Sequence, residues 1–248
     1  MTNLNPRLFF TLGDDGTISY SEFLFLLSLL TKSPTSFEIP FKLIDVSGEG
    51  KISAEEFASF CAMAYKSRKW PTEEALQPHN ETTLVKLFFG TRNHQSALDF
   101  EKFSAFLTSF QREVLLFEFK EFSRGGEFVT AQDFATMLLK FTRLTPEETA
   151  EMMQNLPDNM ISFEEYQVFI NFLNNFEDFG VAVKLFYFAG KPNLGIQEIK
   201  KAASVCLSNG TQLSDKIVQI LYHLFKKPGM TKKSHLFIVS QLNNNGKY

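Results

Sequence analysis

Apolar residues along this chain are grouped in short blocks that have the spacing of buried helix faces. The clearest block places five apolar side chains on one face of a predicted helix: Ile217, Ile220, Leu221, Leu224 and Phe225. They occupy the i, i+3, i+4, i+7 and i+8 positions of a helical stripe. Thr145, Pro146 and Glu148 indicate the start of another helix, because they combine an N-cap, a first-turn proline and a capping box. No long run alternates apolar and polar residues, so we expect an all-α protein with only short two-stranded pairings between loops.

A short pattern recurs along the chain: an aliphatic residue, three further residues, usually an acid, and then an aromatic or aliphatic anchor. Its copies mostly recur about every 31 to 34 residues: Ile18…Glu22-Phe23, Ile52…Glu56-Phe57, Leu98…Lys102-Phe103, Val129…Asp133-Phe134, Ile161…Glu165-Tyr166 and Leu194…Glu198-Ile199. These are positions 8, 12 and 13 of a 12-residue EF-hand loop, in which position 12 opens the exiting helix. We therefore predict two EF-hand-type lobes of repeated helix–loop–helix units, most of them with degenerate loops.

One interval between copies is longer than the others. It contains the run 66–83, which has two prolines and few aliphatic anchors and is typical of a linker or surface loop. We place the boundary there, which gives an N-terminal lobe at 1–65, a linker at 66–83 and a C-terminal lobe at 84–248.

Only one loop carries a nearly complete set of cation ligands. Residues 45–56 offer oxygen atoms at five ligand positions of an EF-hand: Asp45, Ser47, Glu49, Lys51 through its carbonyl group, and Glu56. Gly50 suits the sharp turn, and Ser53 can act through a water molecule. Hard oxygen ligands in a flexible sevenfold arrangement suit Ca²⁺ better than Mg²⁺. We predict one Ca²⁺ per chain, bound at about 10⁻⁵ M or more weakly; the alternative is a loop that keeps only the EF-hand shape.

The remaining loops lack most ligands, and those ending at Lys102, Asp133, Glu165 and Glu198 are predicted to be structural copies. Loop 11–22 has Thr11 and Gly13 where carboxylates are wanted, so we expect it to be empty and to pair with its neighbour. The segment 226–236 has four lysines and no acid. We interpret it as a solvated basic loop, with contact to an acidic partner or anionic lipid head groups as the alternative.

Composition excludes several classes of function. The formal net charge is −3, from 25 basic and 28 acidic residues, which argues against a nucleic-acid partner. No run reaches the roughly 18 apolar residues that would cross a bilayer. The four histidines are scattered and accompany no catalytic motif, so we expect no enzyme activity, no catalytic residues and no organic cofactor. Residues 1–7 resemble neither a secretory signal nor a transit peptide, so either the protein is cytosolic or a targeting segment is missing from this chain.

Several longer blocks resemble the mitochondrial calcium uptake proteins, the EF-hand regulators of the mitochondrial calcium uniporter. The blocks are 18–27, 37–45, 87–90, 115–119, 133–139 and 172–179. The resemblance extends over nearly the whole chain, and it leans towards the second and third paralogues of the family. The family carries two binding loops, of which the first matches residues 45–56 and the second falls on 226–236. The loss of acids from the second loop argues against cooperative two-site sensing.

The resemblance implies a Ca²⁺-sensing gatekeeper subunit that controls Ca²⁺ uptake into the matrix. It implies a homo- or heterodimer with a paralogous uptake protein, and contact with the uniporter pore and its small membrane subunit. The implied location is the mitochondrial intermembrane space, peripheral to the inner membrane. Two alternatives stay open: a Ca²⁺-independent EF-hand scaffold that pairs with a competent sensor, and a cytosolic EF-hand subunit of a phosphatase complex.

Overall fold

The structure is a computed structural model, and it describes residues 18, 20–66, 82–90, 97–140, 144–191, 195–207 and 210–225. The chain divides into two compact units, residues 1–114 and 115–248, which are described separately. The described residues are predominantly helical and contain two short antiparallel strand pairs, so the predicted all-α class is confirmed. Within these residues, no helix is both long and apolar enough to span a bilayer.

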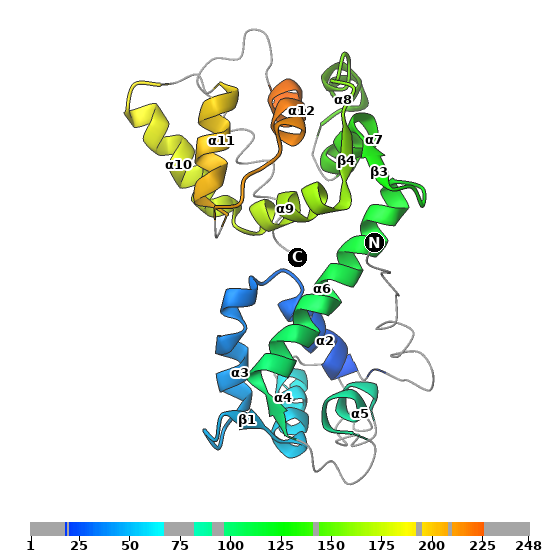
Figure 1. The fold of residues 1–248 in the computed structure, drawn as a ribbon, viewed down its shortest axis with the longest axis vertical. Helices are drawn as coiled ribbons and strands as arrows, with labels where there is room; N and C mark the ends of the chain where they lie inside the picture. Colours follow the sequence, from blue (N-terminus) through cyan, green and yellow to red (C-terminus); the bar gives the residue numbers. More distant parts are fainter. Residues whose placement is uncertain are drawn as a thin grey trace. The chain divides into compact units, whose positions relative to one another are not determined.

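The first unit consists of short helices around one strand pair (Figure 1). Its elements are α2 (Tyr20–Leu29), η1 (Pro34–Ser36), α3 (Glu38–Ile44), β1 (Lys51–Ile52), α4 (Ala54–Lys66), α5 (Thr83–Phe89), β2 (Leu98–Asp99) and the first part of α6 (Phe100–Phe122). Strands β1 and β2 are antiparallel, with Ile52 opposite Leu98, and both side chains are buried. The expected short two-stranded pairing between loops is therefore confirmed, and the two paired residues occupy position 8 of their loops.

The partner loop differs from the one we expected. We predicted that loop 11–22 would pair with its neighbour, but β1 of loop 45–56 pairs with β2, which precedes Lys102. Residues 11–17 and 19 lie outside the described residues. Helices α4 and α5 pack together beside this strand pair, and α4 packs against α2 as well.

Phenylalanine side chains fill the core of this unit. The ring of Phe57 lies edge-on to those of Phe25 and Phe88, with centroid distances of 5.4 Å in both pairs. Phe57 and Phe103, the position-13 anchors of the paired loops, are fully buried. Phe23, the corresponding anchor of the first copy, is instead 51% exposed. The buried stripe of α2 is rotated away from Phe23 and consists of Glu22, Phe25, Leu26 and Leu29.

The boundary between the lobes also requires correction. The core of the first unit includes Leu84 and Phe88 of α5, Leu98 of β2 and Phe103 of α6. The first unit therefore extends to Val114, whereas we predicted that the C-terminal lobe begins at residue 84. The reason is that the strand of loop 45–56 needs its partner loop in the same unit. Residues 67–81 of the predicted linker lie outside the described residues.

The second unit is built on the same principle (Figure 1). It contains the last part of α6, β3 (Phe128–Thr130), α7 (Ala131–Leu139), α8 (Pro146–Met152), β4 (Met160–Ser162), α9 (Phe163–Asn174), α10 (Phe176–Phe188), α11 (Ile196–Val205) and α12 (Asp215–Phe225). Strands β3 and β4 are antiparallel and place Val129 opposite Ile161, again the two position-8 residues. Thr145 caps α8 and forms the predicted capping box with Glu148.

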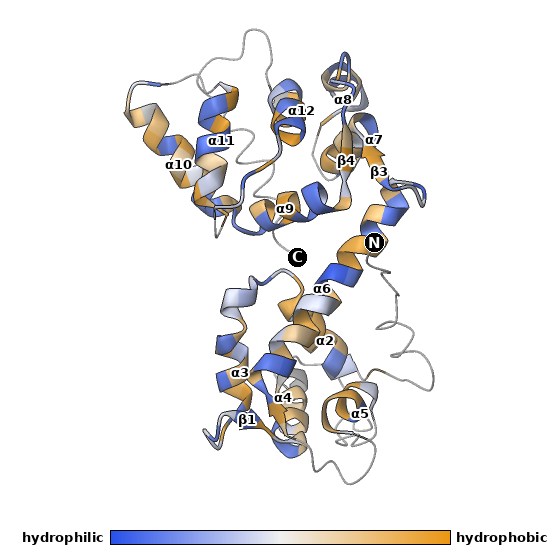
Figure 2. Ribbon diagram, in the orientation of Figure 1, coloured by the Kyte–Doolittle hydropathy of each residue, from blue (hydrophilic) through white to orange (hydrophobic). Residues whose placement is uncertain are grey.

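Helix α12 closes the core of the second unit. It packs against α7, α8, α11 and β4. Its predicted apolar stripe is confirmed for the described side chains, since Ile217, Ile220, Leu221 and Leu224 are buried. Figure 2 shows hydrophobic and hydrophilic residues alternating around these helices, as expected for helices that bury one face.

Candidate metal centre

Loop 45–56 connects α3 to α4 and makes two tight turns. Asp45 follows the last residue of α3 as its C-cap, and Glu56 lies in the first turn of α4. Gly50 has φ +75°, so the turn glycine predicted at position 6 adopts the left-handed conformation that favours glycine. Gly48 has φ +72°, a second left-handed position that we did not predict from the sequence. Its only sequence signal is a glycine two residues before the turn glycine.

The carboxylate of Asp45 is held by the backbone of its own loop. Its Oδ2 accepts a hydrogen bond of 2.8 Å from the Gly50 N–H, and its Oδ1 accepts one of 3.2 Å from the Glu49 N–H. The Ser47 hydroxyl also donates to Oδ1, at 3.2 Å. Asp45 therefore sits at the head of a turn whose N–H groups point inward, which is the arrangement expected of position 1 in an EF-hand loop.

The carboxylate of Glu56 closes the loop from the other end. Its Oε2 accepts hydrogen bonds from the Ser53 N–H at 2.8 Å and from the Ser53 hydroxyl at 2.9 Å, while its Oε1 accepts one from the Ser47 N–H at 2.9 Å. The N–H bonds from Ser53 and Ser47 outweigh the small effect of burial and lower the pKa of Glu56 to about 2. The position-12 carboxylate is therefore ionised at neutral pH, as a calcium ligand must be.

The predicted ligands differ in how closely the structure brings them together. Ser47 bonds to both Asp45 and Glu56, so these three residues form one network. Glu49 joins the network through its N–H group, and its side chain is exposed. Lys51 lies in β1 opposite Asp99. Over the described part of the chain, no three His, Cys, Asp or Glu side chains are grouped closely enough to hold a metal ion.

The donor set nevertheless fits Ca²⁺ in its chemistry. All five predicted ligands offer oxygen atoms, and the two carboxylates at positions 1 and 12 accept hydrogen bonds at opposite ends of the same loop. Both carboxylates accept hydrogen bonds from the loop's own N–H groups. The ligand role of Asp45, Ser47, Glu49, Lys51 and Glu56 therefore remains a prediction.

The position-12 acids of the other loops accept hydrogen bonds from groups of the protein. Glu22 of loop 11–22 is buried and accepts a hydrogen bond from the Thr82 hydroxyl. Asp133 accepts a hydrogen bond from the Thr130 hydroxyl, and Glu165 completes a capping box at the start of α9. Glu198 accepts a hydrogen bond of 3.1 Å from the Gly195 N–H at the start of α11. The basic segment 226–236 lies outside the described residues.

Comparison with known proteins agrees with these features. An EF-hand family model matches residues 39–61, which include the whole of loop 45–56. Calcium uptake protein 2, mitochondrial, of Homo sapiens is 33% identical over 94% of this chain and 56% of its own length. Calcium uptake protein 3, mitochondrial, of Rattus norvegicus is 29% identical over 89% of this chain and 53% of its own length. This chain thus spans about half the length of the curated relatives it matches.

Comparison with solved structures shows to which family this chain belongs. The apo structure of the mitochondrial calcium uniporter protein MICU2 has a TM-score of 0.78 and 33% identity to this chain, covering 97% of this chain and 69% of that one. This chain belongs to the mitochondrial calcium uptake protein family. The structure of EFHA2 in its Ca-binding state has a TM-score of 0.74 and 31% identity, covering 94% of this chain and 78% of that one.

Membership in the mitochondrial calcium uptake protein family confirms the resemblance seen in the sequence. Calcium uptake protein 1 of Homo sapiens is 27% identical, so the leaning towards the second and third paralogues is also confirmed. The EF-hand match and the EF-hand neighbours confirm the predicted class of repeated helix–loop–helix units. These relatives are named as calcium uptake proteins and not as enzymes.

Proposed function

We propose that this protein is a Ca²⁺-sensing regulatory subunit of the mitochondrial calcium uniporter and controls Ca²⁺ uptake into the matrix. The observation that carries the proposal is the position of Glu56. It is an ionised position-12 carboxylate at one end of an oxygen-rich loop that has Asp45 at the other end. None of the other five repeat loops has an acid at both its first and twelfth positions.

The residues that would hold the ion are Asp45, Ser47, Glu49, the Lys51 carbonyl group and Glu56. A bound Ca²⁺ would supply positive charge to which both terminal carboxylates of the loop are attracted. A change at Glu56 can alter the packing of the core because the next residue, Phe57, is fully buried. The ring of Phe57 lies edge-on to that of Phe25 in α2. A change in the partners of Glu56 therefore acts on α4 and on its contact with α2, which is the helix-pair rearrangement used by EF-hand sensors.

The wider assignment rests on the family. We propose a location in the mitochondrial intermembrane space, peripheral to the inner membrane. The proposed partners are a paralogous uptake protein, in a homo- or heterodimer, together with the uniporter pore and its small membrane subunit. The names of the relatives, which are mitochondrial calcium uptake proteins, support the mitochondrial location and favour it over a cytosolic phosphatase complex.

Two measurements test the proposal together. Isothermal titration calorimetry of the purified protein should give one Ca²⁺ per chain and no competition from Mg²⁺ at equal concentration. Ca²⁺ uptake should then be measured in mitochondria that lack their own regulator and receive either the wild-type protein or Glu56→Gln. We expect the variant to lose the dependence of uptake on external Ca²⁺, whereas Glu55→Gln, an exposed neighbour on α4, should behave as wild type. A stoichiometry of zero, or wild-type regulation by Glu56→Gln, would overturn the proposal.

A Ca²⁺-independent scaffold is the second candidate. The observation in its favour is that backbone N–H groups of loop 45–56 donate hydrogen bonds to the carboxylates of both Asp45 and Glu56. Binding of a purified paralogous uptake protein, measured with Ca²⁺ and with a chelator, distinguishes the two. Equal affinity under both conditions supports the scaffold, and a difference supports the sensor.

A further inference from the structure

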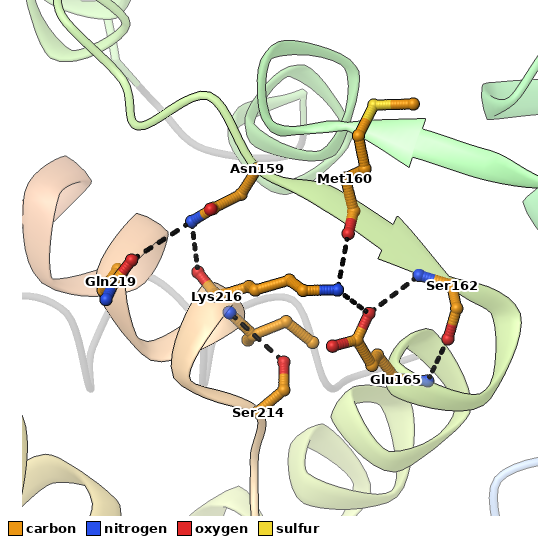
Figure 3. A network of polar contacts seen from close by, with 8 residues as sticks. Asn159, Met160, Ser162, Glu165, Ser214, Lys216 and Gln219 are labelled. Carbon is orange, nitrogen blue, oxygen red and sulfur yellow. Dashed lines mark hydrogen bonds and ion pairs between the residues drawn. The ribbon is translucent and has the colours of Figure 1, made fainter.

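The second unit contains a lysine where an EF-hand loop would hold its metal ion. Lys216 lies in the first turn of α12, and its ammonium Nζ is 3.2 Å from Glu165 Oε2 and 3.0 Å from the Met160 carbonyl oxygen. Figure 3 shows the side chain extended between these two oxygen atoms. Glu165 is position 12 of loop 154–165, and counting back five residues (165 − 5 = 160) makes Met160 position 7. Positions 7 and 12 supply the backbone carbonyl and the carboxylate ligands of a calcium loop.

We propose that Lys216 is an internal cation that fills the metal position of loop 154–165 and fastens α12 to the β3–β4 strand pair. The second unit then keeps a loaded EF-hand geometry without Ca²⁺. This inference is independent of the proposed function, because it concerns a different unit and a different loop.

Lys216 makes several contacts with the loop, although its own side chain is 46% exposed. The side chain of Glu165 is only 20% exposed, and the Ser162 N–H donates to the same oxygen, Oε2, at 2.9 Å. Asn159, at the position usually taken by the turn glycine, donates to the Lys216 carbonyl oxygen at 3.4 Å and to the Gln219 side-chain oxygen at 3.3 Å. Four contacts therefore tie three residues of the loop, Asn159, Met160 and Glu165, to α12 (Figure 3).

The electrostatics of Glu165 agree with a filled cation position. Burial by itself raises the pKa of Glu165, but the hydrogen bonds from Ser162, Lys216 and Ser214 outweigh that effect and leave the pKa below its ordinary value. A carboxylate in this setting is ionised and needs a positive partner. Lys216 provides one positive charge, which suits a loop with acids at only two ligand positions, Asp158 and Glu165.

In two other degenerate loops of this unit the position-12 acid also pairs with a basic side chain, which here comes from within the loop. Arg124, at position 3 of loop 122–133 (133 − 9 = 124), places Nη2 3.5 Å from Asp133 Oδ1. Lys191, at position 5 of loop 187–198 (198 − 7 = 191), places Nζ 3.4 Å from Glu198 Oε1. Among the ion pairs of the described residues, none involves Glu56 of loop 45–56. In three loops the position-12 acid therefore pairs with a basic side chain, whereas no such pair involves Glu56 within the described residues.

The ammonium group of Lys216 is always available to Glu165, whereas a Ca²⁺ ion must bind from solution. Lys216 is held beside Glu165 by the packing of α12, so its effective concentration at the site does not depend on the Ca²⁺ concentration. A Ca²⁺ ion would have to displace the ammonium group from both oxygen atoms, and it would meet no acid at position 1 or position 3, which are Gln154 and Leu156. The structure of this loop is therefore expected to be insensitive to Ca²⁺.

The test uses Lys216→Met in the intact protein, with Lys200→Met as a matched control. Lys200 also reaches α12 through an ion pair, with Nζ 2.6 Å from Asp215 Oδ1, but it makes that contact outside loop 154–165. We expect Lys216→Met to lower the thermal midpoint by about 2–4 °C. We also expect severalfold faster hydrogen exchange of the amides in β3, β4 and the first turn of α12. Lys200→Met should leave the strand amides at the wild-type rate, and exchange in the two variants that is equal at these strands would overturn the proposal.

Two further measurements separate an internal cation from general packing. In a double-mutant cycle, Lys216→Met and Glu165→Gln should cost less together than the sum of the two single variants, and additive costs would contradict the direct pairing. In a Glu56→Gln background, which removes a proposed Ca²⁺ ligand from the first unit, millimolar Ca²⁺ should leave the exchange of residues 154–165 unchanged. If Ca²⁺ protects this loop while Lys216 is present, and Glu165→Gln abolishes the protection, the loop binds the metal itself and the proposal is wrong. None of these outcomes depends on whether loop 45–56 is a sensor.

Discussion

The backbone N–H of Ser47 donates a hydrogen bond of 2.9 Å to Oε1 of Glu56 across the loop. This contact joins position 3 to position 12, so the carboxylate that would bind Ca²⁺ in a bidentate manner already has a partner on each oxygen. A hydrogen bond to a charged group contributes about 1.5–3 kcal/mol, and a bidentate ligand must give up at least part of it. The contact is a physical reason to expect weak binding, in addition to the small number of acids in the loop.

Replacement of Glu56 tests the ligand set directly. Glu56→Gln removes the charge and one acceptor oxygen, and we expect Ca²⁺ affinity to fall at least about tenfold, because each 1.4 kcal/mol of lost interaction is a factor of ten. Calorimetry should show the single binding event disappear from the measurable range. Asp45→Asn should have a similar effect, since it removes the charge at the other end. Unchanged affinity in both variants would exclude this loop as the calcium site.

The hydroxyl of Ser53 caps α4 and orients Glu56. It accepts a hydrogen bond from the Glu56 N–H at 3.2 Å and donates one to Glu56 Oε2 at 2.9 Å. Ser53→Ala should therefore lower the free energy of unfolding by about 1 kcal/mol, the usual cost of losing an N-cap. Urea unfolding measures the change, and Ser59→Ala, at an exposed position in the same helix, is the control that should lie within about 0.5 kcal/mol of wild type. Equal stability of the two variants would show that the cap is not formed.

Phe57 and Phe23 form a natural test of the repeat, because both follow a position-12 acid. Phe57→Ala empties a fully buried site between the rings of Phe25 and Phe88, and it should cost about 3–5 kcal/mol. Phe23→Ala removes a ring that is half exposed and should cost much less. Thermal or urea unfolding of the two variants gives the comparison. A larger loss for Phe23→Ala would contradict the rotation of the α2 stripe.

The pH dependence of stability should reflect Glu165. Its folded-state pKa is lowered below the ordinary value of 4.5, so its network stabilises the protein fully above that pH. The stabilisation is lost as the pH falls below 4.5 and Glu165 takes up a proton, which removes the ionic partner of Lys216. Urea midpoints measured from pH 7 to pH 3 should therefore fall less steeply for Glu165→Gln than for wild type. Parallel curves for the two proteins would contradict this assignment.

The sequence predicted the elements that depend on local pattern and missed those that depend on distant contacts. Val129 opposite Ile161 follows from the position of each residue in its own loop, and so does the left-handed turn at Gly50. The choice of β2 as the partner of β1 does not, because each loop carries the same apolar position 8 and the helices decide which loops meet. The proposed role of Lys216 could not be predicted from the sequence either. Lys216 is 51 residues from Glu165, and its neighbours in the sequence give no signal of a cation site.

The same distinction explains the error at Phe23 and the misplaced boundary. The rotation of α2 is set by which of its faces contacts α4, and both faces are apolar enough to satisfy the repeat pattern. The run 66–83 has the composition of a linker, but the compact unit continues past it because α5 and β2 are needed to complete the first core. Composition therefore identified the connecting segment without showing which unit the following helix joins.

The antiparallel pairing of Ile52 with Leu98 makes the loop with acids at both ends dependent on a neighbour that has none at its own first and twelfth positions. Natural variation at Leu98 or Phe103 should consequently mimic damage to the ligands themselves, although neither residue is ever within the coordination sphere. A genetic screen for impaired calcium response would recover such alleles alongside those at Asp45 and Glu56. Scoring variants by ligand identity alone would classify them as harmless.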